Sequence, residues 1–226
     1  MSEPGDRLTL LVLGVSSDVS QGMLKALAHC TLRIRLIAAC VTPEAVGLFG
    51  AQRAYLSPYA ADPGFVDWVI DVCRRESVDA VLSGVEPVLA ALADASEAIR
   101  EATGAVCVVS PPATLAVGQD KLEGCRWLAA HGLAHPDFAA GDDGGALDAL
   151  HARHGFPLVA KPRRGRGSRG VRLLTDEHEL AGVRGQADLI VQEHLSDADG
   201  EYTVGCLCDR DGRVRGRVAM RRELHE

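Results

Sequence analysis

The chain has few aromatic residues, no closely spaced cysteine pair of the zinc-binding kind, and no long apolar run. Aromatic residues make up 4% of its 226 residues, and its Ala-, Leu- and Val-rich composition is typical of α/β folds rather than β-sandwiches. Its seven cysteines are an odd number without a C-x-x-C motif, which argues against a disulfide framework or a zinc ribbon. It has no signal-peptide core and no stretch of membrane-spanning length, so we expect a cytoplasmic protein.

An overall excess of positive charge is also missing. The formal net charge of −7 argues against general binding to nucleic acid or to a membrane surface. Residues 158–171 depart from this balance, because an apolar run ending at Lys161 is followed by a loop with three glycines, a serine and four arginines. Flexible backbone N–H donors and cationic side chains in one place suit a polyphosphate.

The first half of the chain alternates strand-like and helix-like segments. We expect buried strands at Leu8–Leu13, Ile34–Val41, Ala80–Leu82 and Ala105–Val109, with amphipathic helices between them. This alternation predicts a parallel α/β sheet, and the prolines at 111 and 112 mark its end. We therefore expect a Rossmann-like domain at 1–112 and a second domain at 113–226.

The second half follows a different pattern. A helix is expected over Leu115–His131, and strands are expected on both sides of the glycine loop, at Phe156–Ala160 and Val171–Leu174. The segments at 201–209 and 213–220 read as a hairpin. Cys206 and Cys208 would share one face of it, and we expect them to be buried thiols.

Three phosphate-binding loops compete for the glycine segment. Gly165, Gly167 and Gly170 match G-x-G-x-x-G, but a dinucleotide site needs a helix after the motif, and a strand is expected here. A kinase glycine loop places its lysine on a later strand, whereas Lys161 precedes this loop, and no G-K-[ST] ends the run as in a Walker A loop. The third alternative is an ATP-grasp lid.

Four segments, in order, resemble the ATP-grasp superfamily, in particular its carbamoyl-phosphate-synthase-like and carboxylate–amine-ligase-like members. The segment Lys161–Val171 is similar to the phosphate loop of that superfamily, which joins two antiparallel strands, and Asp120-Lys121 is similar to its first lysine position. Val191–Leu195 resembles its adenine hinge, and Glu201–Val204 resembles its ribose-binding strand. Residues 1–112 resemble the pre-ATP-grasp domain that accompanies it, and the resemblance implies an incomplete α+β ATP-grasp domain at 113–226 with a glycine-rich lid at about 134–192.

The resemblance implies roles for individual residues. Lys161 and Lys121 would contact the phosphates, and the loop would cover them with the residues Gly165, Gly167, Ser168 and Gly170. Glu193 and Leu195 would line the adenine edge, and Glu201 would accept hydrogen bonds from the ribose hydroxyls. Arg221 and Arg222 would lie near the transferred phosphate or the carboxylate substrate as catalytic residues.

The implied reaction is ATP-dependent ligation of a carboxylate and an amine through an acylphosphate. ATP is the expected cofactor together with Mg²⁺, but the acidic metal ligands of the family are not found after Glu201. We therefore expect a truncated chain, a fragmentary gene product or a degenerate relative, and whether it is an enzyme on its own stays open. The alternative is a non-catalytic nucleotide-binding module. Expected partners are small-molecule substrates, with a homodimer left open and no nucleic acid or membrane.

Overall fold

The structure is a computed structural model that describes residues 7–165, 169–196 and 200–222. The chain divides into two compact units, Met1–Val117 and Gly118–Glu226, and each is described by itself. None of the helices in the described ranges has the length and apolar character needed to cross a membrane.

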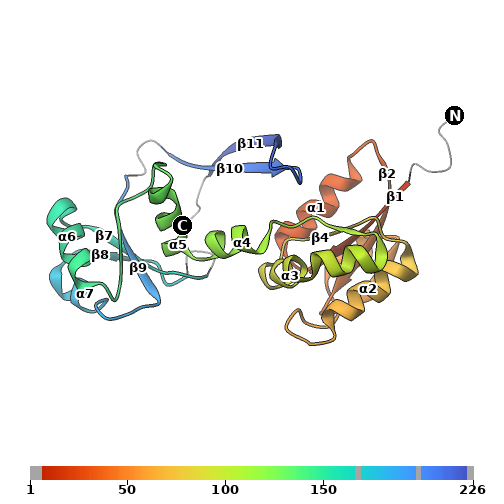
Figure 1. The fold of residues 1–226 in the computed structure, drawn as a ribbon, viewed down its shortest axis with the longest axis horizontal. Coiled ribbons are helices and arrows are strands. Elements are labelled where there is room, and N and C mark those ends of the chain that lie inside the picture. Colours follow the sequence, from red (N-terminus) through yellow and green to blue (C-terminus); the bar gives the residue numbers. More distant parts are fainter. Residues whose placement is uncertain (1–6, 166–168, 197–199, 223–226) are drawn as a thin grey trace. The chain divides into compact units, whose positions relative to one another are not determined.

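The first unit is a five-stranded parallel sheet with helices on both faces (Figure 1). Its strands are β1 (Arg7–Leu13), β2 (Arg33–Cys40), β3 (Arg53–Leu56), β4 (Ala80–Ser83) and β5 (Val106–Cys107), in the order β3-β2-β1-β4-β5. The apolar runs of β1 and β2 are buried on both faces, as parallel strands between two helix layers require. The predicted parallel α/β sheet is confirmed.

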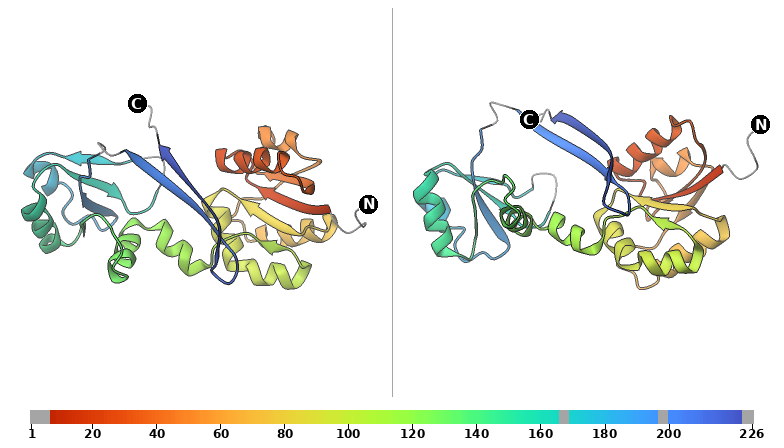
Figure 2. Two further views of the ribbon diagram at one scale, coloured as in Figure 1. Left: turned by 90° about the horizontal axis from the view of Figure 1, so that it is seen from above. Right: turned by 45° about the horizontal axis from the view of Figure 1, so that its top comes forward.

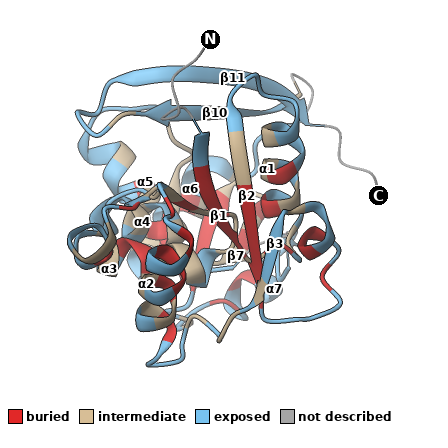
Figure 3. Ribbon diagram, turned by 90° about the vertical axis from the view of Figure 1, so that its right-hand side faces the viewer, coloured by how far each residue is buried: buried red, intermediate tan, exposed pale blue. Residues whose placement is uncertain are grey.

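Two separate cores cover the faces of this sheet. Helix α1 (Asp18–Ala28) and the 3₁₀-helix η1 (Val46–Gly50) pack against one face, and α2 (Phe65–Glu76) and α3 (Glu86–Thr103) pack against the other. Figure 3 shows the strand interiors of β1 and β2 as buried. Helix α4 (Pro112–Gln119) follows and contains no buried residue.

The second unit is built on a four-stranded antiparallel sheet in the order β6-β9-β7-β8. These strands are β6 (Phe138–Ala140), β7 (Leu158–Pro162), β8 (Arg172–Leu174) and β9 (Leu189–Glu193). Helices α6 (Gly144–His154) and α7 (Glu177–Ala181) contribute to the core on one face, and α5 (Lys121–Ala130) packs against the other. Figure 1 shows these helices on opposite sides of the sheet.

Strand alternation assigns each residue of β7 and β9 to one of these faces. Leu158 lies opposite Glu193, and both belong to the face covered by α6, which we call the α6 face. Lys161 lies opposite Ile190, and both belong to the face on which α5 packs, which we call the α5 face. The two predicted ATP-binding residues Lys161 and Glu193 therefore project from opposite faces of one sheet.

The chain continues into a long hairpin of β10 (Glu201–Cys208) and β11 (Val214–Arg222), which lie side by side in both views of Figure 2. Among the described residues, β10 pairs only with β11, and the hairpin forms a sheet of its own. Figure 3 shows it as exposed along its length. The expectation that Cys206 and Cys208 are buried is therefore wrong, because nothing in the described chain covers the hairpin.

Several predicted elements differ in the structure. The helix expected over Leu115–His131 is two helices, because the Asp120 carboxylate caps α5 by accepting the N–H groups of Leu122 and Glu123 and so interrupts the helix. The strand expected over Ala105–Val109 is only Val106–Cys107. The short strands β3 and β6 are not predicted, since four and three residues are too few to display a periodic pattern.

Candidate functional site

Lys161 is a half-buried cation without a protein partner. It lies near the end of β7 on the α5 face, and within the described ranges its ammonium group makes neither a hydrogen bond nor an ion pair. Burial and the neighbouring Lys121 ammonium lower the pKa of Lys161, while the Cys125 thiol acts in the opposite direction. A half-buried ammonium that the chain leaves unpaired is a natural binding position for an anion.

The surface beside Lys161 is apolar and partly open. Val159 lies two residues earlier on β7 and therefore on the same face, directly opposite Leu173 of β8. Leu173 is 48% exposed, whereas its neighbour Leu174 on the α6 face is buried. Helix α5 packs over β6 and β9 through Ala140 and Ile190. An apolar strip next to an unpaired cation is thus available on β7 and β8.

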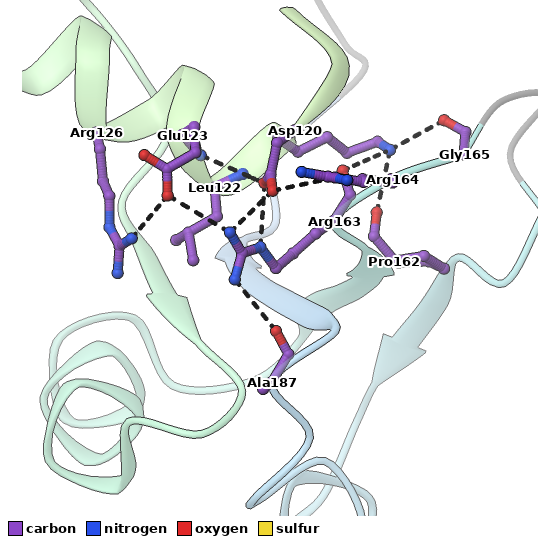
Figure 4. Close-up of polar contacts among 10 residues, drawn as sticks. Asp120, Leu122, Glu123, Arg126, Pro162, Arg163, Arg164, Gly165 and Ala187 are labelled. Carbon is purple, nitrogen blue, oxygen red and sulfur yellow. Dashed lines mark hydrogen bonds and ion pairs between the residues drawn. The ribbon is translucent and has the colours of Figure 1, made fainter. Parts of the chain in front are cut away.

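Lys121 ties the start of α5 to the segment that follows β7. Its Nζ atom lies 3.0 Å from the carbonyl oxygen of Pro162, 3.4 Å from that of Arg163 and 3.1 Å from that of Gly165 (Figure 4). Its backbone N–H donates to the Arg163 carbonyl at 2.9 Å. In this structure the ammonium is therefore used to hold the base of the glycine segment.

Arg163 is held in a bidentate ion pair with Asp120. Its Nε and Nη2 atoms donate to the two carboxylate oxygens of Asp120 at 3.1 and 2.8 Å, and Nη1 donates to the Ala187 carbonyl at 3.3 Å. Burial raises the pKa of Asp120, but hydrogen bonds from Arg163 and from the N–H groups of Glu123 and Leu122 hold it below its usual value. Because its guanidinium is committed in this way, Arg163 supports the loop rather than offering free charge to a phosphate.

The glycine segment joins two antiparallel strands, β7 and β8, as expected. Gly165 and Gly170 have φ angles of 127° and 75°, which only glycine adopts readily. A Cβ atom on Gly170 would also lie 2.9 Å from Cγ of Pro162. Gly167 and Ser168 fall outside the described residues. Arg164 has a side chain that is 81% exposed, 3.6 Å from Asp120, beside a cavity of about 470 Å³.

Glu193 points away from Lys161, into the α6 face. Its Oε1 atom accepts the N–H of Asp137 at 2.8 Å, and its Oε2 atom lies 3.5 Å from Nδ1 of His154. The Glu193 carboxylate is thus bound within the protein. Only the main chain of the expected adenine hinge, Val191–Leu195, is left to contact an adenine on the α5 face. Leu195, two residues beyond, is 62% exposed.

The remaining predicted residues gather on the hairpin. Glu201 lies opposite Arg222 and forms an ion pair with it, and Tyr202 lies opposite Arg221. The structure thus places the predicted residues in three sets. One comprises Lys121, Lys161, Gly165 and Gly170, the second comprises Glu193 and Leu195 at the end of β9, and the third comprises Glu201, Arg221 and Arg222. No strand pairing in the described chain joins the third set to the first two.

A metal site beside Lys161 does not emerge from the described residues. There, Asp137, His154 and Glu193 form the one group of three His, Cys, Asp or Glu side chains close enough to share an ion. This group is on the α6 face, and the acids near Lys121, Asp120 and Glu123, are paired with Arg163. The described oxygen donors therefore do not fit a Mg²⁺ site beside Lys161.

Sequence reasoning assigned no role to Asp137 or His154. They are 17 residues apart, and Asp137 is 56 residues from Glu193, so no local motif joins them. The fold brings them together because β6 and β9 are paired and α6 ends beside their junction. The available signal was a histidine at the end of an expected helix, which is too common to carry an assignment.

Comparison with known proteins places these features in context. Residues 10–108 match the family described as PylC-like, N-terminal domain. A protein described as "Uncharacterized protein y4rH" from Sinorhizobium fredii is 31% identical over 148 residues, which cover 58% of this chain and 31% of that protein. The match to the family model agrees with the resemblance of the first unit to a pre-ATP-grasp domain.

Solved structures extend the similarity to nearly the whole chain. The Staphylococcus aureus N5-carboxyaminoimidazole synthetase, complexed with ADP, has a TM-score of 0.71 at 13% identity, over 98% of this chain and 56% of that chain. The biotin carboxylase domain of the Hydrogenobacter thermophilus 2-oxoglutarate carboxylase has a TM-score of 0.64 at 16% identity, over 91% of this chain and 48% of that chain.

An L-amino acid ligase from Bacillus licheniformis has a TM-score of 0.59 at 17% identity, over 90% of this chain and 49% of that chain. The chain thus spans about half the length of these three structures. All three are ATP-grasp enzymes, so the resemblance to this superfamily is confirmed at the level of the fold.

Proposed function

We propose that this chain, which has the fold of the ATP-grasp enzymes, binds ATP on the α5 face of its second unit and serves as the nucleotide-binding part of a carboxylate–amine ligase. The observation that carries the proposal is Lys161, a half-buried cation without a partner in the described chain, next to an apolar strip and a glycine segment between antiparallel strands. This combination suits an adenine ring followed by phosphates.

The residues around the proposed site would have different roles in ATP binding. Lys161 would bind phosphate oxygens directly, and the apolar strip of Val159 and Leu173 would contact the base. Lys121 and Arg163 would position the segment after β7, whose N–H groups approach the phosphates. Exclusion of water by this segment would strengthen the electrostatic interaction between Lys161 and the phosphates.

The reaction proposed for the ligase is a transfer in two steps. An oxygen of the substrate carboxylate attacks the γ-phosphorus of ATP, which breaks the bond to the β-phosphate oxygen and releases ADP. The nitrogen of an amine then attacks the acylphosphate carbon, and inorganic phosphate leaves as the proton on nitrogen is lost. No protein nucleophile is required, and no step is assigned to Mg²⁺ ligands of this chain.

A second candidate is a nucleotide-binding module without catalytic activity. It is favoured by the arginine pairing of the acids nearest Lys121, which leaves no set of metal ligands beside Lys161 among the described residues. Incubation of the chain with Mg-ATP and a panel of carboxylates and amines distinguishes the two. ADP release that requires a carboxylate supports the ligase, and ATP binding without ADP release supports the module.

The binding site itself is tested by calorimetric titration of the full chain with ATP. We expect Lys161→Ala to weaken ATP binding by about 10- to 100-fold, since a hydrogen bond to a charged group contributes about 1.5–3 kcal/mol. Lys25→Ala, which alters an exposed lysine of α1, is the matched control and should leave the affinity unchanged. Equal affinity of the wild type and Lys161→Ala would refute the site.

A further inference from the structure

His154 lies between two carboxylates at the end of α6. Its Nε2 atom is 2.7 Å from Oδ2 of Asp137, and its Nδ1 atom is 3.5 Å from Oε2 of Glu193. The His154 side chain is 25% exposed, so these contacts are only partly screened by solvent. Both ring nitrogens can donate to their carboxylates only when the ring carries both protons.

The same contacts connect three elements of the second unit. Asp137 immediately precedes β6, Glu193 ends β9, and His154 ends α6. Asp137 and Glu193 are also joined directly, because the Glu193 N–H donates to the Asp137 carbonyl at 3.0 Å and the Asp137 N–H donates to the Glu193 carboxylate. We call these three residues the hinge brace.

Arg153 adds a cation to the hinge brace. Nη1 of Arg153 donates to Oδ2 of Asp137 at 2.7 Å, and the hydrogen bonds from His154 and Arg153 hold the pKa of Asp137 below its usual value. His135 lines a cavity of about 200 Å³ together with Asp137 and Arg153. The two carboxylates are thus met by two basic side chains, an arrangement that fits a charge network rather than an unfilled cation site.

We infer that His154 is a positioning residue for the adenine-binding end of β9, an inference that rests on the proposed function. By holding the Glu193 carboxylate on the α6 face, His154 fixes the main chain at residues 193–195. The main-chain N–H and carbonyl groups of these residues are the groups that could contact the edge of an adenine on the α5 face. Glu193 accordingly orients the hinge and does not itself contact the base.

If His154 positions the hinge, the binding of the adenine and the binding of the phosphates depend on different residues. Loss of the hinge brace should weaken contacts to adenine and leave contacts to the phosphates intact, because Lys161 lies at the opposite end of the β7–β9 pairing, opposite Ile190. A general loss of stability would instead weaken both. The two effects can be compared with ATP and with inorganic tripolyphosphate as ligands of the full chain.

The experiment uses four variants of the full chain, His154→Ala, His154→Asn, His154→Gln and, as control, His178→Ala in α7, where His178 is exposed. The amide of Asn can reach the position of Nδ1 next to Glu193, and that of Gln can reach the position of Nε2 next to Asp137. We expect His154→Ala to weaken ATP binding by about tenfold and tripolyphosphate binding by less than about twofold. His154→Asn should recover most of the lost ATP affinity, and His178→Ala should not alter it.

Each of the following results would contradict a different part of the account. Full recovery by His154→Gln but not by His154→Asn would overturn the role of the Glu193 contact, and an equal loss of both ligands in His154→Ala would reduce His154 to a structural residue. Tight binding of Zn²⁺ alone to the wild type, abolished by His154→Ala, would assign the cluster to a metal ion and overturn the inference. Absence of ATP binding to the wild type would refute the proposed function itself, before any His154 variant is compared.

Discussion

The Asp120 side chain has two tasks that the other capping residues in the described part of the chain do not combine. It accepts two backbone N–H groups at the start of α5 and also holds Arg163 through both carboxylate oxygens. Asp143 caps α6 in a simpler way, with one hydrogen bond from the N–H of Ala146 at 3.0 Å. The comparison isolates what the contact with Arg163 adds to a helix cap.

We predict that Asp120→Ala lowers the free energy of unfolding by about 2–3 kcal/mol, the sum of a lost cap and a lost, partly buried ion pair. Asp143→Ala, the matched control, should cost about 1 kcal/mol. Urea denaturation followed by circular dichroism measures both. Equal losses for the two variants would mean that the Arg163 ion pair does not stabilise the fold.

The lowered pKa of Asp120 also predicts how stability depends on pH. A carboxyl group whose pKa is lower when folded stabilises the protein above its unfolded pKa of about 3.9, and this contribution is lost as the pH falls through the folded value. Asp120→Asn should therefore flatten the loss of stability below about pH 4, when compared with the wild type in denaturation curves at each pH. An unchanged slope would contradict the assignment.

In each strand of the four-stranded sheet, the face on which a side chain lies decides how deeply that side chain is buried. Leu174 and Leu173 are neighbours on β8, but Leu174 is 1% exposed in the core of the α6 face, and Leu173 is 48% exposed on the α5 face. Both are leucines in the same strand, so a comparison between them removes differences in composition and strand propensity.

We predict that Leu174→Ala costs about 2–5 kcal/mol of unfolding free energy because it opens a cavity, and that Leu173→Ala costs less than about 1 kcal/mol. Leu173→Ala should instead weaken ATP binding, since Leu173 belongs to the apolar strip proposed for the base. Denaturation and titration of the two variants test this. The reverse order of stabilities would mean that the faces are assigned wrongly.

Much of the element pattern could be predicted from local sequence, and the reasons for the failures are physical. The buried runs of β1 and β2 and the strands that flank the glycine segment follow from apolar continuity and alternation. The break at Asp120 could not be predicted from periodicity, because it is set by a capping carboxylate that accepts the N–H groups of Leu122 and Glu123 and not by a change in the apolar pattern. The direction of Glu193 likewise follows from its register against Leu158, which only the folded sheet defines.

At the scale of the whole molecule, the two units have separate cores. The first is centred on the parallel sheet and the second on the antiparallel sheet, and α4, which spans the boundary at Val117, contains no buried residue. A helix without buried side chains is held mainly by its own backbone hydrogen bonds and opens locally at little cost.

We predict that brief digestion with subtilisin, a protease of broad specificity, cuts within residues 110–120 and leaves two resistant fragments. Their masses, measured by mass spectrometry, should correspond to the first unit and to the second unit with or without its uncovered hairpin, because the two cores protect the backbone that they cover. Early cleavage inside β1 or β9, before any cut near α4, would contradict the division.

The chain contains three lysines, Lys25, Lys121 and Lys161, and this makes the central claim directly measurable. The full chain is acylated at limiting reagent with and without saturating ATP, and the extent of modification at each lysine is read by mass spectrometry. We predict that ATP reduces modification of Lys161 severalfold while the exposed Lys25 reacts equally in both samples. Modification of Lys161 that is unchanged by ATP, at ATP concentrations that a titration proves saturating, would contradict the account.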